Sequence, residues 1–260
     1  MKLKFLGTGG GRYVTGMQRR RTAGIILETD ETKIHVDPGP GALVYANQED
    51  DPEETEAVVV SHAHPDHSND AEALIEMMTE AYDNPGAIFA NKTCMDGHGD
   101  IEKVISEYHK NLCLDVEQLE ECGSYSFKDL EIESQEMFHG DPHTQGLKFS
   151  TEEKIIGFWT DTEFSEELLP FYDDCDTMVI YCTRPRGRGI KGHTSINDVP
   201  DILEASDAST AIITHFGYAM LDSDMDEEKE WLEDQVDAKI IFAEDGMQFP
   251  GDAKLSRFAP

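Results

Sequence analysis

The sequence predicts a layered α/β fold formed by a single domain over residues 1–260. Short apolar runs typical of buried strands recur along the chain, for example at residues 57–60, 155–159 and 211–214. In the second half, such runs alternate with segments of helical periodicity, a pattern typical of sheets covered by helices. A chain of 260 residues is also long enough to bury a sizeable core.

The expected elements follow from periodicity and turn residues. In the first half, we expect strands at residues 2–6, 23–28, 33–36, 58–60 and 87–90, and helices at 42–47, 70–82 and 100–110. In the second half, we expect β-rich stretches at 124–137 and 146–150, strands at 155–159, 178–181, 211–214 and 239–243, and helices at 196–205 and 226–237.

The chain is strongly acidic, with 54 acidic and 21 basic residues and a formal net charge of −33. Such a surface repels nucleic acid except at a local basic patch. The charge serves solubility, or it indicates a cytoplasm of high ionic strength, where about 1 M salt shortens the Debye length to about 3 Å. We favour salt adaptation.

Cellular location is predicted from the N-terminus and the cysteines. Residues 1–7 predict a short strand rather than a signal peptide, and no apolar window is long enough to span a membrane. Five cysteines without close pairs are typical of a reducing cytosol. We therefore expect a cytoplasmic protein that does not bind membranes.

The segment Ser61-His62-Ala63-His64-Pro65-Asp66-His67 directly follows an apolar strand and gathers three imidazoles and a carboxylate. These groups are ligands for zinc and neighbouring first-row metals. The alternative, a polar surface loop, does not explain so dense an arrangement of titratable groups. We therefore predict a metal site at the end of this strand.

This segment resembles the HxHxDH signature of the metallo-β-lactamase-fold hydrolases, and His139, Asp161 and His215 match further positions in the same chain order. The resemblance implies an αββα sandwich with a metal site at one edge of two sheets. It also implies that one metal is held by His62, His64 and His139, the other by Asp66, His67 and His215, and that Asp161 bridges both.

By the same resemblance Asp66 takes part in catalysis, and Asp37 orients a ligand histidine. Two divalent ions about 3.5–4 Å apart suit a phosphodiester displacement. Zinc, manganese and iron are all compatible with these ligands.

Three local alternatives remain open. His143 competes with His139 as a ligand, although His139 is preferred for its distance from Gly146. Asp161 could instead cap a helix, and His215 could be an ordinary loop histidine. Finally, Cys94, His98, His109 and Cys113 have the spacing of a structural zinc site, but buried thiols and a surface histidine explain them better.

The segment Gly192-His193-Thr194-Ser195 resembles the GH(S/T) segment of ribonuclease Z-like phosphodiesterases. The resemblance implies that His193 lies near the metals and donates a proton to the leaving alkoxide, a role suited to histidine. Ser195 is expected to cap the helix that follows.

Arginines cluster at residues 19–21 and 184–188 within an otherwise acidic chain. Guanidinium groups match phosphate oxygens in bidentate geometry, so Arg20, Arg184, Arg186 and Arg188 are candidates for substrate binding. The alternative is internal ion pairing with the many carboxylates.

The predicted function is a dinuclear metal-dependent phosphodiesterase acting on a small cyclic or nucleotide-like substrate. Only 22 positions separate His139 from Asp161, which leaves no room there for the substrate-gripping arm of ribonuclease Z. RNA processing is therefore an alternative, as is hydrolysis of an ester, thioester or lactone. By resemblance to family members that dimerise, a homodimer is also an expected state.

Overall fold

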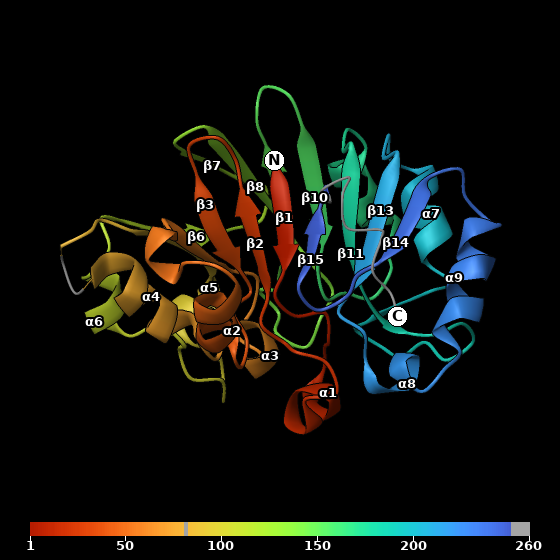
Figure 1. Ribbon diagram of the computed structural model, residues 1–260, viewed down its shortest axis with the longest axis horizontal. Helices are drawn as coiled ribbons and strands as arrows, with labels where there is room; N and C mark the ends of the chain where they lie inside the picture. Colours follow the sequence, from red (N-terminus) through yellow and green to blue (C-terminus); the bar gives the residue numbers. More distant parts are fainter. Residues whose placement is uncertain (81–82, 251–260) are drawn as a thin grey trace.

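The computed structural model describes residues 1–80 and 83–250. Two sheets face each other and carry helices on their outer sides (Figure 1). The first sheet contains, in spatial order, β15 (Met247–Phe249), β1 (Lys2–Phe5), β2 (Ile25–Glu28), β3 (Lys33–Val36), β4 (Ala57–Val60), β5 (Ala87–Asn91) and β6 (Asp115–Leu119). From β3 to β6 the strands are parallel.

The second sheet follows the order β14 (Lys239–Phe242), β13 (Thr210–Thr214), β11 (Thr177–Arg184), β10 (Ile155–Trp159), β9 (Gln145–Ser150), β8 (Leu130–Glu136) and β7 (Gly123–Phe127). The short strand β12 (Thr194–Ser195) pairs with β11. From β10 to β14 the strands are parallel, whereas β7 to β10 form an antiparallel meander.

The core has three layers, as the alternation of side chains along each strand requires. In β4, for example, Ala57 and Val59 face the opposing sheet, whereas Val58 and Val60 face the helices. Because both faces are buried, β4 is uniformly apolar, which is typical of a parallel strand. The predicted αββα sandwich is confirmed.

Two groups of helices cover the sheets. The first sheet carries α2 (Ala42–Glu49), α4 (Ala71–Thr79), α5 (Lys92–Asp96) and α6 (Glu107–Lys110), and the second carries the 3₁₀ helix η3 (Glu166–Tyr172), α7 (Val199–Glu204) and α9 (Met225–Glu233). A short 3₁₀ turn, η1 (Pro52–Glu54), precedes β4. The remaining helices are α1 (Arg12–Met17), α3 (Pro65–Ser68) and α8 (Tyr218–Leu221), and α1 projects from the body in Figure 1.

Most expected elements are present, but three helices are shorter than predicted. The helix expected over 226–237 ends at Glu233. In place of a helix over 100–110, only α6 forms, because the amides of Val104 and Ile105 both donate to the Cys94 carbonyl. Ser106 then caps the helix just before Glu107. The helix expected from residue 196 begins at Val199 and follows Asp198, not Ser195. Ser195 instead lies in β12 and donates its hydroxyl to Asp198.

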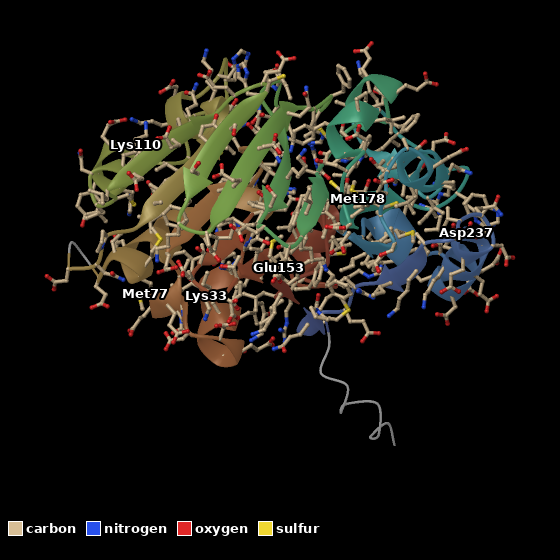
Figure 2. All side chains as sticks on the ribbon, turned by 90° about the horizontal axis from the view of Figure 1, so that it is seen from above. Lys33, Met77, Lys110, Glu153, Met178 and Asp237 are labelled. Atoms are coloured by element: carbon tan, nitrogen blue, oxygen red, sulfur yellow. The ribbon has the colours of Figure 1, made fainter. Side chains whose placement is uncertain are left out.

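The end of the helix expected over 70–82 falls on residues 81–82, which lie outside the described residues. Within the described part of the chain, no helix is long and apolar enough to cross a membrane. Figure 2 shows charged side chains around the periphery, with the labelled Lys110 and Asp237 at opposite ends of the long axis.

Candidate metal centre

The ends of several strands deliver polar side chains to one edge of the two sheets. His62 and His64 follow β4, Asp37 follows β3, and the second sheet supplies three more groups. His139 follows β8, Asp161 follows β10 and His215 follows β13. Because parallel strands end at the same edge, residues far apart in sequence converge there.

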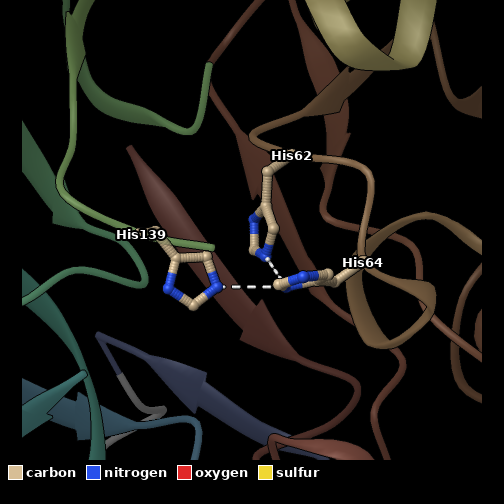
Figure 3. A group of neighbouring side chains, drawn as sticks. All are labelled: His62, His64 and His139. Carbon is tan, nitrogen blue, oxygen red and sulfur yellow. Dashed lines mark hydrogen bonds between the residues drawn. The ribbon is translucent and has the colours of Figure 1, made fainter. Parts of the chain in front are cut away.

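Three imidazoles converge on one point (Figure 3). His62 Nε2 and His139 Nε2 each lie 3.0 Å from His64 Nδ1. An imidazole nitrogen offers either one proton or one lone pair, so His64 Nδ1 cannot form strong hydrogen bonds with both neighbours at once. A cation that accepts three nitrogen lone pairs satisfies all of them.

Asp161 lies at the centre of the site. Its Oδ2 atom is within 4.0 Å of one nitrogen of each of five histidines, namely His62, His67, His139, His193 and His215. The ligand atoms form four possible metal-binding groups: His62, His64, His139; His62, His67, Asp161; Asp66, His67, His215; and His139, Asp161, His193. The two implied sets of three ligands therefore lie together, with Asp161 between them.

Asp66 completes the set of ligands that contains His67 and His215. Its Oδ2 atom lies 3.7 Å from His67 Nε2 and 3.6 Å from His215 Nε2, and it accepts a hydrogen bond of 2.6 Å from the Gly11 amide. Pro65 at the start of α3 restricts the backbone before Asp66 and His67, which places both side chains on the first turn.

The outward nitrogens of three histidines are held by hydrogen bonds. His67 Nδ1 lies 3.0 Å from Asp37 Oδ2, and His139 Nδ1 lies 2.6 Å from the Gly192 carbonyl. His62 Nδ1 contacts the Ser61 hydroxyl at 3.0 Å. Such partners fix the ring orientation and aim the other nitrogen at a metal.

Asp37 occupies the orienting position that the sequence predicted. It is buried, accepts hydrogen bonds from the Ser61 amide and hydroxyl, and accepts another from the Tyr181 hydroxyl at 3.1 Å. Asp37 and His215 both have left-handed backbones, with φ of 52° and 59°. Such strain in non-glycine residues is often found at functional sites.

The electrostatics of the site favour a cation. Burial alone would lower the pKa of His67, but Asp37, Asp66 and Asp161 outweigh it and hold that pKa well above the usual value. Burial likewise opposes ionisation of Asp161, but His215, His193 and His67 hold its pKa well below the usual value. The carboxylates thus create a site that attracts positive charge.

Buried polar atoms without hydrogen-bond partners provide a direct test of whether metals fit. Within the described residues, four such atoms belong to this cluster: His67 Nε2, Asp161 Oδ1, His193 Nδ1 and His215 Nε2. Leaving buried polar groups unpaired costs free energy, so their concentration here needs an explanation. Divalent metal ions supply the missing partners, and the residues present fit them.

The structure separates the two competing histidines. His139 lies in the cluster, whereas His143 lies 3.6 Å from Glu136 and packs its ring 5.2 Å from that of His98. Asp161 begins no helix, since η3 starts only at Glu166. Within the described residues, Cys94, His98, His109 and Cys113 form no metal-binding group, and His109 instead contacts Glu72 and Glu76.

Of the four arginines expected to bind substrate, two have internal partners. Arg20 donates to the Thr8 hydroxyl and the Ala243 carbonyl, and Arg186 pairs with Glu227 and Glu228. Internal pairing therefore accounts for these two side chains. Arg188 is exposed in the loop after Arg186.

Arg184 is the member of the set that faces the site. It lines a cavity of about 260 Å³ together with His193, Arg12, Tyr13 and Tyr218. In the described part of the chain, neither Arg184 nor Arg12 has a carboxylate within 4.0 Å. Arg12 was not predicted, because it lies outside both arginine clusters in the sequence.

Sequence reasoning also missed Asp141, which is fully buried beside the ligand loops. Its carboxylate accepts hydrogen bonds from the Ala63 amide, between His62 and His64, and from the side chains of Asn91 and Thr93. No pattern distinguishes this aspartate from the many surface carboxylates of the chain.

Comparisons with known proteins agree with this geometry. Residues 32–216 match the family model of the beta-lactamase superfamily domain. An uncharacterised protein of Methanocaldococcus jannaschii is 32% identical over 252 residues, which cover 95% of this chain and 94% of that protein.

Two solved structures show the same fold at low sequence identity. The metallo-β-lactamase fold protein YhfI from Bacillus subtilis has a TM-score of 0.80 at 15% identity, covering 95% of this chain and 98% of that one. A diphosphatase from the PhnP family has a TM-score of 0.67 at 17% identity, covering 95% and 96%. With the family model matched across the metal cluster, the chain belongs to the β-lactamase superfamily, as a metal-dependent hydrolase of the metallo-β-lactamase fold.

Proposed function

We propose that the protein is a dinuclear metal-dependent phosphodiesterase that acts on a small, cyclic or nucleotide-like phosphodiester. The observation that carries the proposal is that His193 and Arg184 line one cavity beside Asp161. An acid–base group, an unpaired guanidinium and a metal-binding carboxylate thus surround the same space. A diphosphatase from the PhnP family is among the proteins that share the fold, which is compatible with phosphate chemistry.

The proposed metal ligands are His62, His64 and His139 for one ion, Asp66, His67 and His215 for the other, and Asp161 between them. When bound, two divalent ions supply Lewis acidity toward water and toward the phosphoryl oxygens. Zinc, manganese and iron all suit these nitrogen and oxygen donors.

His193 is placed to move a proton. Its Nδ1 atom is buried and lies 3.8 Å from Asp161 Oδ2, while the side chain is 23% exposed. The exposed side of the ring is left for the substrate. A histidine in this position can donate a proton to the leaving alkoxide.

Arg184 is placed to hold the phosphate. A guanidinium without an internal carboxylate partner remains free to form bidentate hydrogen bonds with phosphate oxygens. Esters and thioesters carry no such anionic group, so an unpaired arginine at the site favours a phosphodiester. The segment of sequence between His139 and Asp161 forms β9 and β10, and it does not contain the arm expected of ribonuclease Z.

Hydrolysis of bis(p-nitrophenyl) phosphate tests the proposal. The protein is reconstituted with zinc or manganese in high salt and compared with Asp161→Ala and with a surface control, Asp234→Ala. Turnover in the wild type and the control, lost in Asp161→Ala, is the expected result. Absence of turnover from protein shown to hold two metals overturns the proposal, and turnover of p-nitrophenyl acetate under the same conditions favours an esterase.

A further inference from the structure

A second and larger cavity lies on the other side of His139. It has a volume of about 700 Å³ and is lined by Phe138, Phe164, Glu163, Lys191 and the loop around Gly192. This volume lies within the range of small-molecule sites, which combine apolar walls with a few polar groups. The proposed phosphodiesterase mechanism does not use these residues.

Phe138 is exposed although it is a large aromatic side chain. Its exposed fraction is 47%, whereas its backbone is held by two hydrogen bonds, from its amide to the Thr162 hydroxyl and from the Glu163 amide to its carbonyl. The chain therefore fixes the position of a phenyl ring that packs only in part against the protein. A ring held in this way is suited to stacking against a ligand.

Phe164 is the second aromatic residue of the cavity wall, and its ring packs against the protein interior. Its ring stacks on that of Trp159, with centroids 6.3 Å apart and planes inclined by 27°. Trp159 is itself fixed, because its indole donates a hydrogen bond of 2.9 Å to the buried hydroxyl of Thr194. The Phe164 side of the aromatic wall is thus supported by packing against buried groups.

The cavity adjoins the metal centre at two residues. His139 lines the cavity and also contacts His64 at the metal centre, and Gly192 holds the His139 ring through its carbonyl. A methyl group added to Gly140 would lie 3.4 Å from His64, so the cavity wall closely approaches a proposed ligand. The cavity therefore lies beside the position that a substrate at the metals would take.

The polar groups at the rim favour a heterocycle over an alkyl group. Glu163 and Ser165 offer a carboxylate and a hydroxyl, and Lys191 adds a cation. No carboxylate lies within 4.0 Å of the Lys191 amine among residues 1–80 and 83–250. A nucleobase presents flat faces to the two phenylalanines and hydrogen-bonding edges to this rim.

We propose that this cavity binds the base of a nucleoside-bearing phosphodiester, with Phe138 and Phe164 as the residues that determine specificity. The proposal rests on the phosphodiesterase function and narrows its substrate class from small phosphodiesters in general to those that carry a base. Every base has an aromatic face, so stacking selects for a base without selecting which one.

Binding of AMP and of ribose 5-phosphate to the zinc-loaded protein, measured by calorimetry at fixed salt, separates the base from the phosphate. We expect AMP to bind roughly tenfold or more tightly than ribose 5-phosphate, as stacking on an aromatic side chain allows. Phe138→Ala should abolish this difference and leave the affinity for ribose 5-phosphate unchanged. Phe138→Tyr should restore it, because the aromatic face returns.

Two controls keep the outcomes separate. Tyr108→Ala removes an aromatic side chain that is 50% exposed on α6, so it should leave the selectivity for AMP unchanged. Because Phe164 packs on Trp159 and its loss endangers folding, Phe138 is the primary variant. Equal affinities in the wild type overturn the proposal, as does selectivity that survives in Phe138→Ala. Turnover of bis(p-nitrophenyl) phosphate, measured in parallel, reports on the phosphodiesterase function alone.

Discussion

Gly10 lies directly against the ring of His215. A Cβ atom at residue 10 would come within 2.2 Å of the His215 ring atoms Cδ2 and Nε2. Because Nε2 is the atom that faces Asp66 and Asp161, the absence of a side chain at residue 10 is a condition for the proposed second metal.

Gly10→Ala should displace His215 and remove the second metal while the first remains. The expected zinc content, measured by atomic absorption after dialysis, falls from two ions toward one per chain. The matched control is Gly16→Ala in α1, where a Cβ would meet no atom within 4 Å. If Gly10→Ala retains two zinc ions with unchanged affinity, His215 is not a ligand.

Asp141→Ala should destabilise the fold and loosen the first metal. The buried carboxylate links the loop of His139 to the Ala63 amide. Its removal leaves these donors buried without a partner, which costs about 2–4 kcal/mol in total. Asp141→Asn keeps the shape and one acceptor oxygen, so it should lose less. Urea unfolding together with zinc affinity checks both effects. Unchanged zinc affinity in a destabilised Asp141→Ala would limit Asp141 to a purely structural role.

Arg184→Ala should weaken substrate binding, whereas Arg186→Ala should not. Hydrogen bonds to charged groups contribute about 1.5–3 kcal/mol, so KM for a phosphodiester should rise roughly tenfold or more in Arg184→Ala. Arg186 is occupied by Glu227 and Glu228 and serves as the matched control two residues further along the chain. Steady-state kinetics of both variants distinguishes them, and an equal effect of the two would show that this segment acts only through its overall charge.

The parts of the site that are local in sequence were predictable, and the parts that depend on packing were not. His62, His64 and His67 share one segment after a buried strand, so their convergence follows from the order of the residues. Arg20 and Arg186, in contrast, have the right chemistry but different partners, because the fold brings Thr8 and Glu228 to them from distant segments. Sequence shows which residue types are present, but it does not show which internal partners they find.

The same distinction applies to the fold. The strand Ile155–Trp159 was predicted with correct bounds, because an apolar run bounded by polar residues has few alternatives. The helix expected over 100–110 failed where the amides of Val104 and Ile105 donate to the Cys94 carbonyl instead of to helical partners. The cavity beside Phe138 depends on Phe164 and Lys191, which only the folded chain brings together.

Added salt should stabilise the protein, since its formal net charge of −33 produces self-repulsion. The expected result is a rise in the urea midpoint mainly between 0.05 and 0.5 M KCl, because screening changes most steeply at low ionic strength. A rise that continues linearly to 2 M would indicate preferential exclusion of salt instead. A flat response would contradict salt adaptation through charge.

His35 should make the protein sensitive to mild acid. Burial lowers its pKa to about 4 from the usual 6.5, and only its Nε2 atom has a partner, the Ala23 carbonyl at 2.8 Å. Between these pKa values the unfolded chain binds more protons than the folded one, so the free energy of unfolding falls as the pH falls from about 6.5 toward 4. Each pKa unit corresponds to about 1.4 kcal/mol, which gives a loss of about 2 kcal/mol between pH 7.5 and 5.

His35→Gln removes this titration and retains a donor for the Ala23 carbonyl. In urea unfolding with a chelator present, the wild type should lose about 2 kcal/mol more than His35→Gln between pH 7.5 and 5. The histidines of the metal site titrate in both proteins and cancel in the comparison. Parallel pH dependences of the two proteins would show that His35 is protonated without penalty, and the acid sensitivity would then have to arise from the metal-site histidines.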